Sequence, residues 1–315
     1  MVIAVTMCKL LAALLLGYYL NKRGILDEGT SKRLSTMIVN YVLPFLIISS
    51  VAGIEGNQGE VLVLFLAGLL CYCIFPLIAW VLVRFLRVPV TLRGTYMCML
   101  IFSNNSFMGY PVVSALFGNQ AIFYTTIFHM AFNLMFFSLG MILIRRDAQV
   151  DEYKPDRPLR PRERLAVVRQ VANNGVIASI LALVIYFCRI PLPGIVSETC
   201  SFIGNVCMPL SMMVIGCSIA GYPLRELFTE KRVYFVAAFR LILLPLLTYF
   251  GVGLLIPNNE IVKIATITVG MPIASLVAMG SAPFREQGKA ASIAVVFSTL
   301  CSMATIPVMC MLLGA

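Results

Sequence analysis

The chain reads Ser103-Asn104-Asn105-Ser106-Phe107-Met108-Gly109-Tyr110-Pro111 at a point where a membrane-spanning helix would otherwise continue. Apolar residues 96–102 precede this polar run, and residues 112–117 follow it. In hydrocarbon every backbone polar group needs an internal partner, so a helix break at that depth persists only inside protein or beside a water-filled cavity. The run therefore predicts a broken helix that lines a site near the middle of the bilayer.

A second stretch repeats the end of the first one. Gly109-Tyr110-Pro111-Val112-Val113-Ser114 corresponds to Gly270-Met271-Pro272-Ile273-Ala274-Ser275. Glycine- and proline-interrupted spans at matching positions of two halves point to a binding site formed where the breaks meet. The sequence thus predicts two broken helices.

Composition assigns the chain to the membrane proteins. Of its 315 residues 60% are hydrophobic and only 12% are charged, and the mean hydropathy is +0.93. An ordinary soluble chain is about half apolar and a quarter charged. Apolar runs of about 18 residues or more, each long enough to cross a bilayer, recur along the chain. We expect an all-α polytopic protein with ten transmembrane helices, over 2–20, 34–53, 61–83, 94–117, 120–144, 171–188, 198–220, 233–256, 261–281 and 290–313.

The basic residues predict one orientation in the membrane. If the N-terminus is outside, 20 of the 24 Lys and Arg residues fall in cytoplasmic loops. Positive charge concentrates on the cytoplasmic side of membrane proteins, so both termini are expected outside. This placement also accounts for the net charge of +10 without a nucleic-acid partner, because the basic residues line the cytoplasmic face, where they lie near anionic lipid.

The polar, proline-containing segment from 145 to 170 divides the ten spans into two sets of five. We expect a first five-helix repeat over 1–144, a cytoplasmic linker over 145–170 and a second repeat over 171–315. An odd number of spans per half inverts the second repeat relative to the first. Helix 4 of the first repeat and helix 9 of the second are expected to be broken and to cross. Three matches in order support a duplication: Asn40 and Pro44 with Asn205 and Pro209, Pro76 with Pro245, and Gly109 and Pro111 with Gly270 and Pro272.

The residues at the breaks are the candidates for substrate binding. Asn104, Asn105 and Ser106 offer amide and hydroxyl groups, although they could instead satisfy only the unwound backbone. Glycine and proline are expected to shape the crossing, and a serine follows each proline by three residues. The substrate-binding candidates are Asn104, Asn105, Ser106, Gly109, Pro111, Ser114, Gly270, Pro272 and Ser275.

Five further polar residues inside spans are candidates for support or for a proton path. Asn40 and Asn205 either face a pocket or bond across helices. His129, the single histidine, shares a helix face with Asn133 and is either a proton carrier or a residue bonded to a neighbouring helix. Arg240 either extends to the cytoplasmic interface or binds an anion.

The distribution of acidic residues favours an anionic or neutral solute. All fourteen Asp and Glu fall in loops or at span ends, whereas cation pumps and proton relays usually keep carboxylates inside the membrane. The chain lacks HExxH, GxSxG and phosphate-binding glycine loops, so we expect neither an enzyme nor an ATP-driven pump. No metal site or cofactor is expected, and the ten cysteines, with no CxxC pair, read as small buried hydrophobes.

The motifs resemble those of the auxin efflux carrier family. Residues 103–111 resemble that family's fourth-helix crossover, in which an Asn precedes Met-Gly-x-Pro. Asn40-Tyr41-Val42-Leu43-Pro44 is similar to its second helix, and Val295-Val296-Phe297-Ser298-Thr299-Leu300 with Thr305-Ile306-Pro307 is similar to its last helix. The resemblance covers nearly the whole chain.

The resemblance implies an inverted-repeat fold with a scaffold domain and a transport domain that moves as an elevator. It implies transport of organic anions: the auxin carboxylate in plant members, and dicarboxylates such as malate and malonate in bacterial ones. Asn104 matches the family's crossover Asn, so the substrate-contacting role carries over to it. The second crossover has no Asn beside its proline, and Ser275 is the nearest substitute.

We therefore predict a secondary transporter of a small organic anion that works by alternating access in the plasma (inner) membrane. Two alternatives stay open, a cation-coupled or cation/proton antiporter of the same architecture and a non-transporting membrane sensor. The expected partners are the anion and the lipid bilayer, with a coupling proton and a homodimer left undecided.

Overall fold

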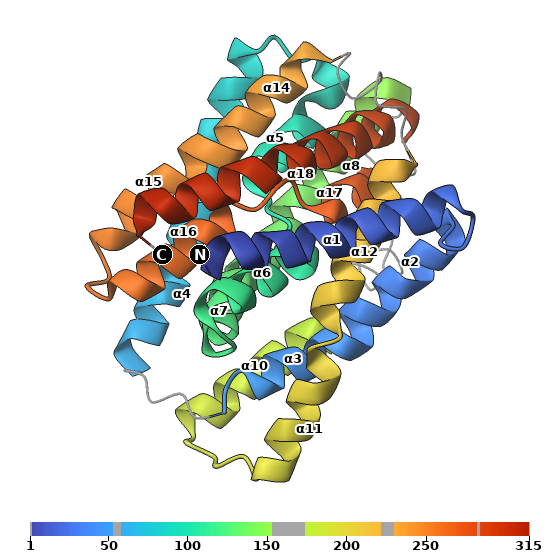
Figure 1. Cartoon of the computed structure of the whole chain (residues 1–315). Coiled ribbons are helices and arrows are strands. Elements are labelled where there is room, and N and C mark those ends of the chain that lie inside the picture. Colours follow the sequence, from blue (N-terminus) through green and yellow to red (C-terminus); the bar gives the residue numbers. More distant parts are fainter. Residues whose placement is uncertain (1, 53–57, 153–173, 222–229, 282–283, 315) are drawn as a thin grey trace, which may run out of the picture.

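The computed structural model describes residues 2–52, 58–152, 174–221, 230–281 and 284–314, and every regular element in these ranges is a helix (Figure 1). Five helical segments are long and apolar enough to cross a membrane, and two shorter apolar helices span 90–101 and 174–187. The five are Gln58–Phe85, Gln120–Asp147, Gly194–Ala220, Lys231–Gly253 and Glu286–Leu313. The described residues confirm an all-helical fold, and their long apolar helices are consistent with a membrane protein. The count of ten spans and their inverted repeat stay predictions.

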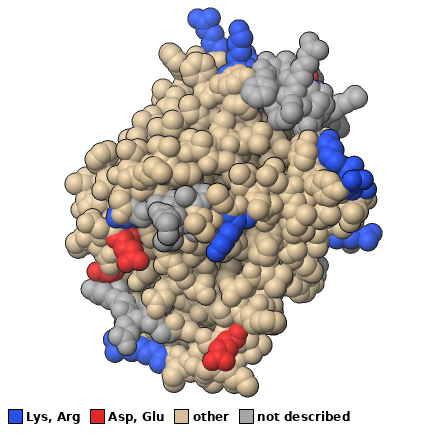
Figure 2. Space-filling model, in the orientation of Figure 1, with Lys and Arg blue, Asp and Glu red and all other residues tan. Residues whose placement is uncertain are grey.

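The outer surface suits a lipid environment. Phe202 and Leu254 are 80% and 87% exposed, and many other large apolar side chains are also exposed. On the face drawn in Figure 2, charged residues lie mainly toward the edges and most of the surface carries neither acid nor base. Apolar side chains of this size find their favourable contacts in hydrocarbon rather than in water.

The first half of the chain forms helices of unequal length, several of which are interrupted by a wider π-helical turn. They are α1 (Val2–Lys22), α2 (Glu28–Met37), η1 (Ile38–Val42), α3 (Leu43–Ser49), α4 (Gln58–Phe85), η2 (Val90–Leu92), α5 (Arg93–Ile101), η3 (Asn105–Gly109), α6 (Tyr110–Phe117), α7 (Gln120–Met135), η4 (Phe136–Gly140) and α8 (Met141–Glu152).

The second half continues in the same manner. Its helices are α10 (Asn174–Phe187), α11 (Gly194–Gly204), α12 (Cys207–Ala220), α14 (Lys231–Ala238), η5 (Phe239–Leu243), α15 (Leu244–Gly253), α16 (Asn259–Val269), α17 (Ser275–Ser281) and α18 (Arg285–Leu313). In both halves one helix is split: α5 is separated from η3 and α6, and α16 is separated from α17.

Proline explains where three of the π-helical turns lie. Pro44, Pro111 and Pro245 each stand two residues after the end of η1, η3 and η5. Proline has no N–H and its ring crowds the carbonyl four residues earlier, so a widened turn relieves the clash. At Pro44 that carbonyl belongs to Asn40, and it accepts a hydrogen bond from Asn174 Nδ2 at 2.7 Å. One proline of each matched pair therefore follows a widened turn, whereas Pro76, the partner of Pro245, lies inside the continuous helix α4.

The helices pack as two groups, each containing elements from both halves of the chain. The panel group consists of α1, α2, α3, α10, α11 and α12, and the crossing group consists of α4 to α8 and α14 to α18. Within the panel group α1 packs along α12 (Figure 1). Gly17 faces the backbone of Met213, and Gly216 faces the backbone of Leu14, so neither position has room for a Cβ. The two glycines thus fix the closest helix approach in this group.

The end of α8 lies in a segment expected to be linker. Asp147 is 3% exposed, and its carboxylate accepts hydrogen bonds from the N–H groups of Gly94 and Thr95 at 2.8 and 2.7 Å and from Thr95 Oγ1 at 3.0 Å. These donors are the free N–H groups of the first turn of α5, which a carboxylate stabilises through charge and hydrogen bonding. Asp147 is therefore a buried cap that positions α5. Residues 153–170 of the predicted linker lie outside the described residues.

Candidate functional site

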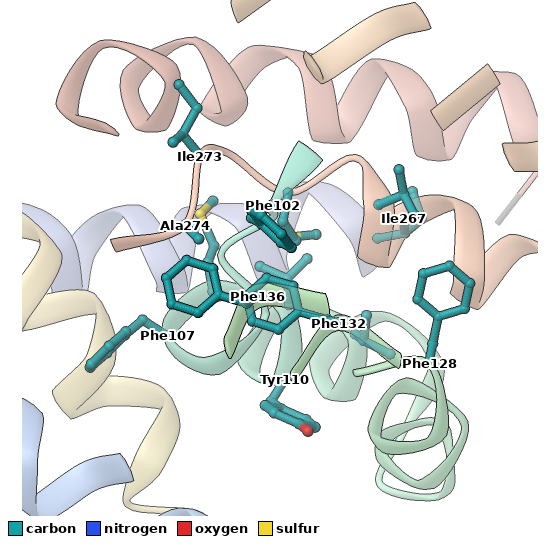
Figure 3. Close-up of a cluster of buried hydrophobic side chains, with 14 of the residues drawn as sticks. Phe102, Phe107, Tyr110, Phe128, Phe132, Phe136, Ile267, Ile273 and Ala274 are labelled. Atoms are coloured by element: carbon teal, nitrogen blue, oxygen red, sulfur yellow. The ribbon is translucent and has the colours of Figure 1, made fainter. Parts of the chain in front are cut away.

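The two broken helices cross through backbone hydrogen bonds. Asn104 N donates to Pro272 O at 2.8 Å and Ala274 N donates to Phe102 O at 2.9 Å, which makes a short antiparallel pairing of Ser103 with Ile273. In Figure 3 the extended segment that carries Ile273 and Ala274 passes over the segment that carries Phe102. The pairing satisfies polar groups that both breaks release from their helices. The predicted breaks and their meeting are therefore present.

Other backbone groups of the crossing also find partners. Ile273 N donates to Ser298 Oγ of α18 at 3.1 Å. The carbonyl of Asn104 accepts hydrogen bonds from the N–H groups of Met108 and Gly109 at 3.1 and 3.0 Å, and η3 begins with these two bonds. Main-chain groups and the Ser298 hydroxyl thus bond the extended segments of the crossing.

Side chains from both breaks meet at Asn104 and Ser275. Asn104 Nδ2 donates to Ser275 Oγ at 3.2 Å, and Asn104 is 3% exposed. The Asn104 Oδ1 and the Ser275 hydroxyl keep hydrogen-bonding capacity beyond this contact. Ser275, taken from the sequence as the nearest substitute for a second crossover Asn, lies beside Asn104.

A pocket of about 540 Å³ opens beside this pair, between the panel group and the crossing group. Asn104, Phe107 and Ser275 line it from the crossing, and α1, α2, α12 and α18 supply the other walls. Its polar lining comprises Asn21, Glu28, Ser31, Lys32, Ser35, Asn104, Ser218, Ser275, Ser292 and Thr299. The lining thus offers neutral hydrogen-bonding groups, one acid (Glu28) and one base (Lys32), which can hold a small polar solute.

Helix α2 brings the charged part of that lining. It begins at Asp27, whose carboxylate accepts the N–H of Thr30 at 2.9 Å, and this bonding holds the pKa of Asp27 below its ordinary value. Glu28 and Lys32 follow one turn apart and share a helix face, which is the face that lines the pocket.

Aromatic residues form a rigid layer behind the crossing. Phe102 meets Phe132 and Phe136 edge to face, with ring centroids 5.3 and 5.0 Å apart, and stacks on Tyr72 at 6.2 Å. Such edge-to-face pairs stabilise a packed core beyond their buried area. Phe107 instead points away from this cluster in Figure 3 and lines the pocket.

His129 sits directly behind the first break. It is 6% exposed, its Nδ1 lies 3.3 Å from Asn105 Nδ2, and its Nε2 lies 3.4 Å from Ser106 Oγ. Its ring stacks on Phe132, with centroids 4.6 Å apart. His129 therefore supports the polar residues of the break from the side away from the pocket.

Arg240 is buried at the crossing. It has 0% exposure, and its guanidinium donates to Leu100 O and Ile101 O at 3.2 and 3.3 Å and to Val269 O at 2.7 Å. The interpretation that this side chain extends to the cytoplasmic interface is wrong. The carbonyls of two helix ends, which a sequence pattern does not bring together, hold the side chain inside the protein.

The other sequence candidates divide by position. Gly109, Pro111, Gly270 and Pro272 are buried in the backbone of the two breaks. Ser114 lies away from the pocket and bonds Asn119 Oδ1 at 2.8 Å. Three asparagines also lie outside the pocket lining: Asn40 in η1, Asn133 one turn beyond His129 in α7, and the exposed Asn205 at the end of α11.

Sequence reasoning missed the walls of the pocket on α2 and α18. Ser292, Val295, Val296 and Thr299 line it from α18, at the spacing i, i+3, i+4, i+7 of one helix face. That spacing was readable, but on an apolar helix it does not distinguish a pocket wall from a packed interface. Among the described residues no three His, Cys, Asp or Glu side chains are grouped closely enough to hold a metal ion.

Apolar helices, two breaks that cross inside the protein and a polar pocket beside them define the class of membrane transport proteins. A family model described as "Membrane transport protein" matches residues 2–310, so the chain belongs to this family, and the resemblance to the auxin efflux carriers is confirmed. The chain is also similar to an uncharacterized transporter of Methanothermobacter thermautotrophicus, with 24% identity over 308 residues that cover 96% of this chain and 95% of that protein.

Proposed function

We propose that this protein is a secondary transporter of a small organic anion, a carboxylate such as a dicarboxylic acid, that binds at Asn104 and Ser275. The observation that carries the proposal is the pocket, because both breaks contribute a neutral hydrogen-bonding side chain to it. The continuous helix of η3 and α6 begins at Asn104, and the positive end of its dipole favours a negative group there. Lys32 adds a positive charge to the lining.

The two helix groups support an elevator mechanism. The pocket lies between the panel group and the crossing group, so sliding the crossing group past the panel would carry Asn104 and Ser275 across the membrane. We propose ten spans in two inverted five-helix repeats, 1–144 and 171–315, in the plasma membrane, with both termini on its outer side. In this arrangement the end of α1 and the start of α2 that line the pocket are cytoplasmic, so this state is open to the inside.

The first test is thermal stabilisation of the purified protein by a panel of mono- and dicarboxylic acids, in sodium or in choline buffer. A ligand that binds only the folded protein raises its stability by mass action. At hundredfold excess over Kd we expect the melting temperature to rise by about 5 °C or more with the transported acid. The rise should be the same in both buffers. Stabilisation by sodium alone would replace this proposal with the cation-coupled alternative, and a response to neither would favour a sensor.

A second test addresses the direction in which the pocket opens. In a cysteine-free background, Ser218→Cys on the pocket wall is expected to react with a membrane-impermeant maleimide in inside-out vesicles and much less in right-side-out ones. The matched control is Ser138→Cys, which is also exposed but lies in η4, within the apolar segment Gln120–Asp147 and away from the pocket, where lipid is expected to keep the reagent out. Equal labelling of both variants, or reaction of Ser218→Cys only from outside, would contradict the proposed orientation.

A further inference from the structure

Arg240 joins the C-terminal ends of the two half helices that meet at the crossing. Leu100 and Ile101 are the last residues of α5, and Val269 is the last residue of α16. One guanidinium nitrogen donates to the first two carbonyls and the other donates to the third. The same cation therefore contacts both helix ends.

The charges at this point balance without an acid. A helix C-terminus carries about half a negative elementary charge, so two such ends together offset about one positive charge. Among the described residues Arg240 has no carboxylate partner, and the groups that it bonds are main-chain carbonyls. Burying a charge without compensation would be strongly unfavourable, so the helix ends are its counter-charge.

The position is one that a mobile cation takes in other membrane transporters. Where helices are broken in the membrane, the carbonyls at half-helix C-terminal ends coordinate a coupling Na⁺ or H⁺. Here three such carbonyls already accept hydrogen bonds from the guanidinium, at 2.7 to 3.3 Å.

We propose that the Arg240 guanidinium is a tethered cation that occupies the place of a coupling ion, so that the crossing assembles without Na⁺. Arg240 is thus a positioning residue: it acts on the substrate through the geometry of α5 and α16, whose ends lead into Asn104 and Ser275. The consequence for transport rests on the proposed function, whereas the effect on the crossing does not.

The test compares Arg240→Lys with Arg240→Met, two unbranched side chains of similar length, by thermal unfolding of purified protein without substrate. If the guanidinium had no counter-charge, replacing it with an apolar group would remove the cost of burying the charge, and the melting temperature would stay the same or rise. The tethered cation predicts the opposite order, with the Lys variant melting about 5 °C or more above the Met variant. An equal or higher melting temperature for Arg240→Met would overturn the proposal.

Chemical rescue gives a second readout. In Arg240→Ala, low millimolar guanidinium is expected to raise the melting temperature, while wild-type protein and Ser114→Ala do not respond. The absence of any rise in Arg240→Ala would contradict an ion-sized vacancy at the crossing.

Wild-type protein keeps the proposal testable if the variants fail to fold. Its melting temperature is expected to be the same in sodium and in choline buffer, and a saturable rise with sodium would overturn the proposal. None of these measurements uses an organic acid, so a wrong substrate assignment would leave their outcome unchanged.

Discussion

Asn104→Ala is expected to lower uptake of the transported anion into vesicles by about tenfold or more, with normal expression and membrane insertion. The substitution keeps the backbone bonds of Asn104 to Pro272, Met108 and Gly109 and removes the side-chain bond to Ser275. A polar group of the solute left without its partner costs about 1–3 kcal/mol, which corresponds to a loss of about 5-fold to 150-fold in affinity.

The measurement combines initial uptake rates with melting temperatures, because only the pair separates a binding defect from a folding defect. Loss of the Asn104–Ser275 bond is expected to lower stability by about 1 kcal/mol. Ser275→Ala should raise the half-saturating concentration for uptake, whereas Ser114→Ala, which changes the serine at the matching sequence position but outside the pocket, should leave uptake unchanged. Unaltered uptake by Asn104→Ala would remove Asn104 from the binding site.

The second large effect is expected from Gly216→Ala, which adds one methyl group between α12 and α1. At this position the new Cβ would overlap the backbone of Leu14, and backbone cannot rotate away as a side chain can. Overpacking of this kind costs about 1–3 kcal/mol and occasionally more, so the melting temperature should fall by about 5 °C. In Gly17→Ala the new Cβ would overlap the backbone of Met213, so this variant should also melt at a lower temperature than the wild type.

The control for this prediction is Gly251→Ala in α15. Gly251 is exposed, and no heavy atom lies within 4 Å of the place that a Cβ would take there. Alanine favours the helix by about 1 kcal/mol over glycine, so this variant should be unchanged or slightly more stable. If Gly216→Ala melts at the wild-type temperature, α1 and α12 do not approach as closely as described.

The sequence was most informative where it departs from the composition expected of a membrane helix. The run from Ser103 to Pro111 predicted a break because polar residues and proline are unfavourable in hydrocarbon. The serine three residues after each proline suggested a symmetric site, yet only Ser275 reaches the pocket. Ser114 follows in a helix that turns away, which a repeated motif does not reveal.

Contacts between segments far apart in the chain could not be predicted from the sequence. Arg240 bonds residues that lie 140, 139 and 29 positions away, and their carbonyls belong to the main chain, which has no sequence signature. Asp147 looked like one more charge of a polar linker, because nothing local shows that α5 begins beside it. Tertiary packing decides both cases.

The crossing is held mainly by main-chain groups, and this separates architecture from selectivity. The pairing of Ser103 with Ile273 and the bonds of Asn104 N and Ala274 N do not depend on which side chains those positions carry. In the proposed function, substitutions at Asn104 and Ser275 would therefore change the substrate while this main-chain pairing stays the same. On that proposal, a single residue change at either position would be enough to give the same architecture a new substrate.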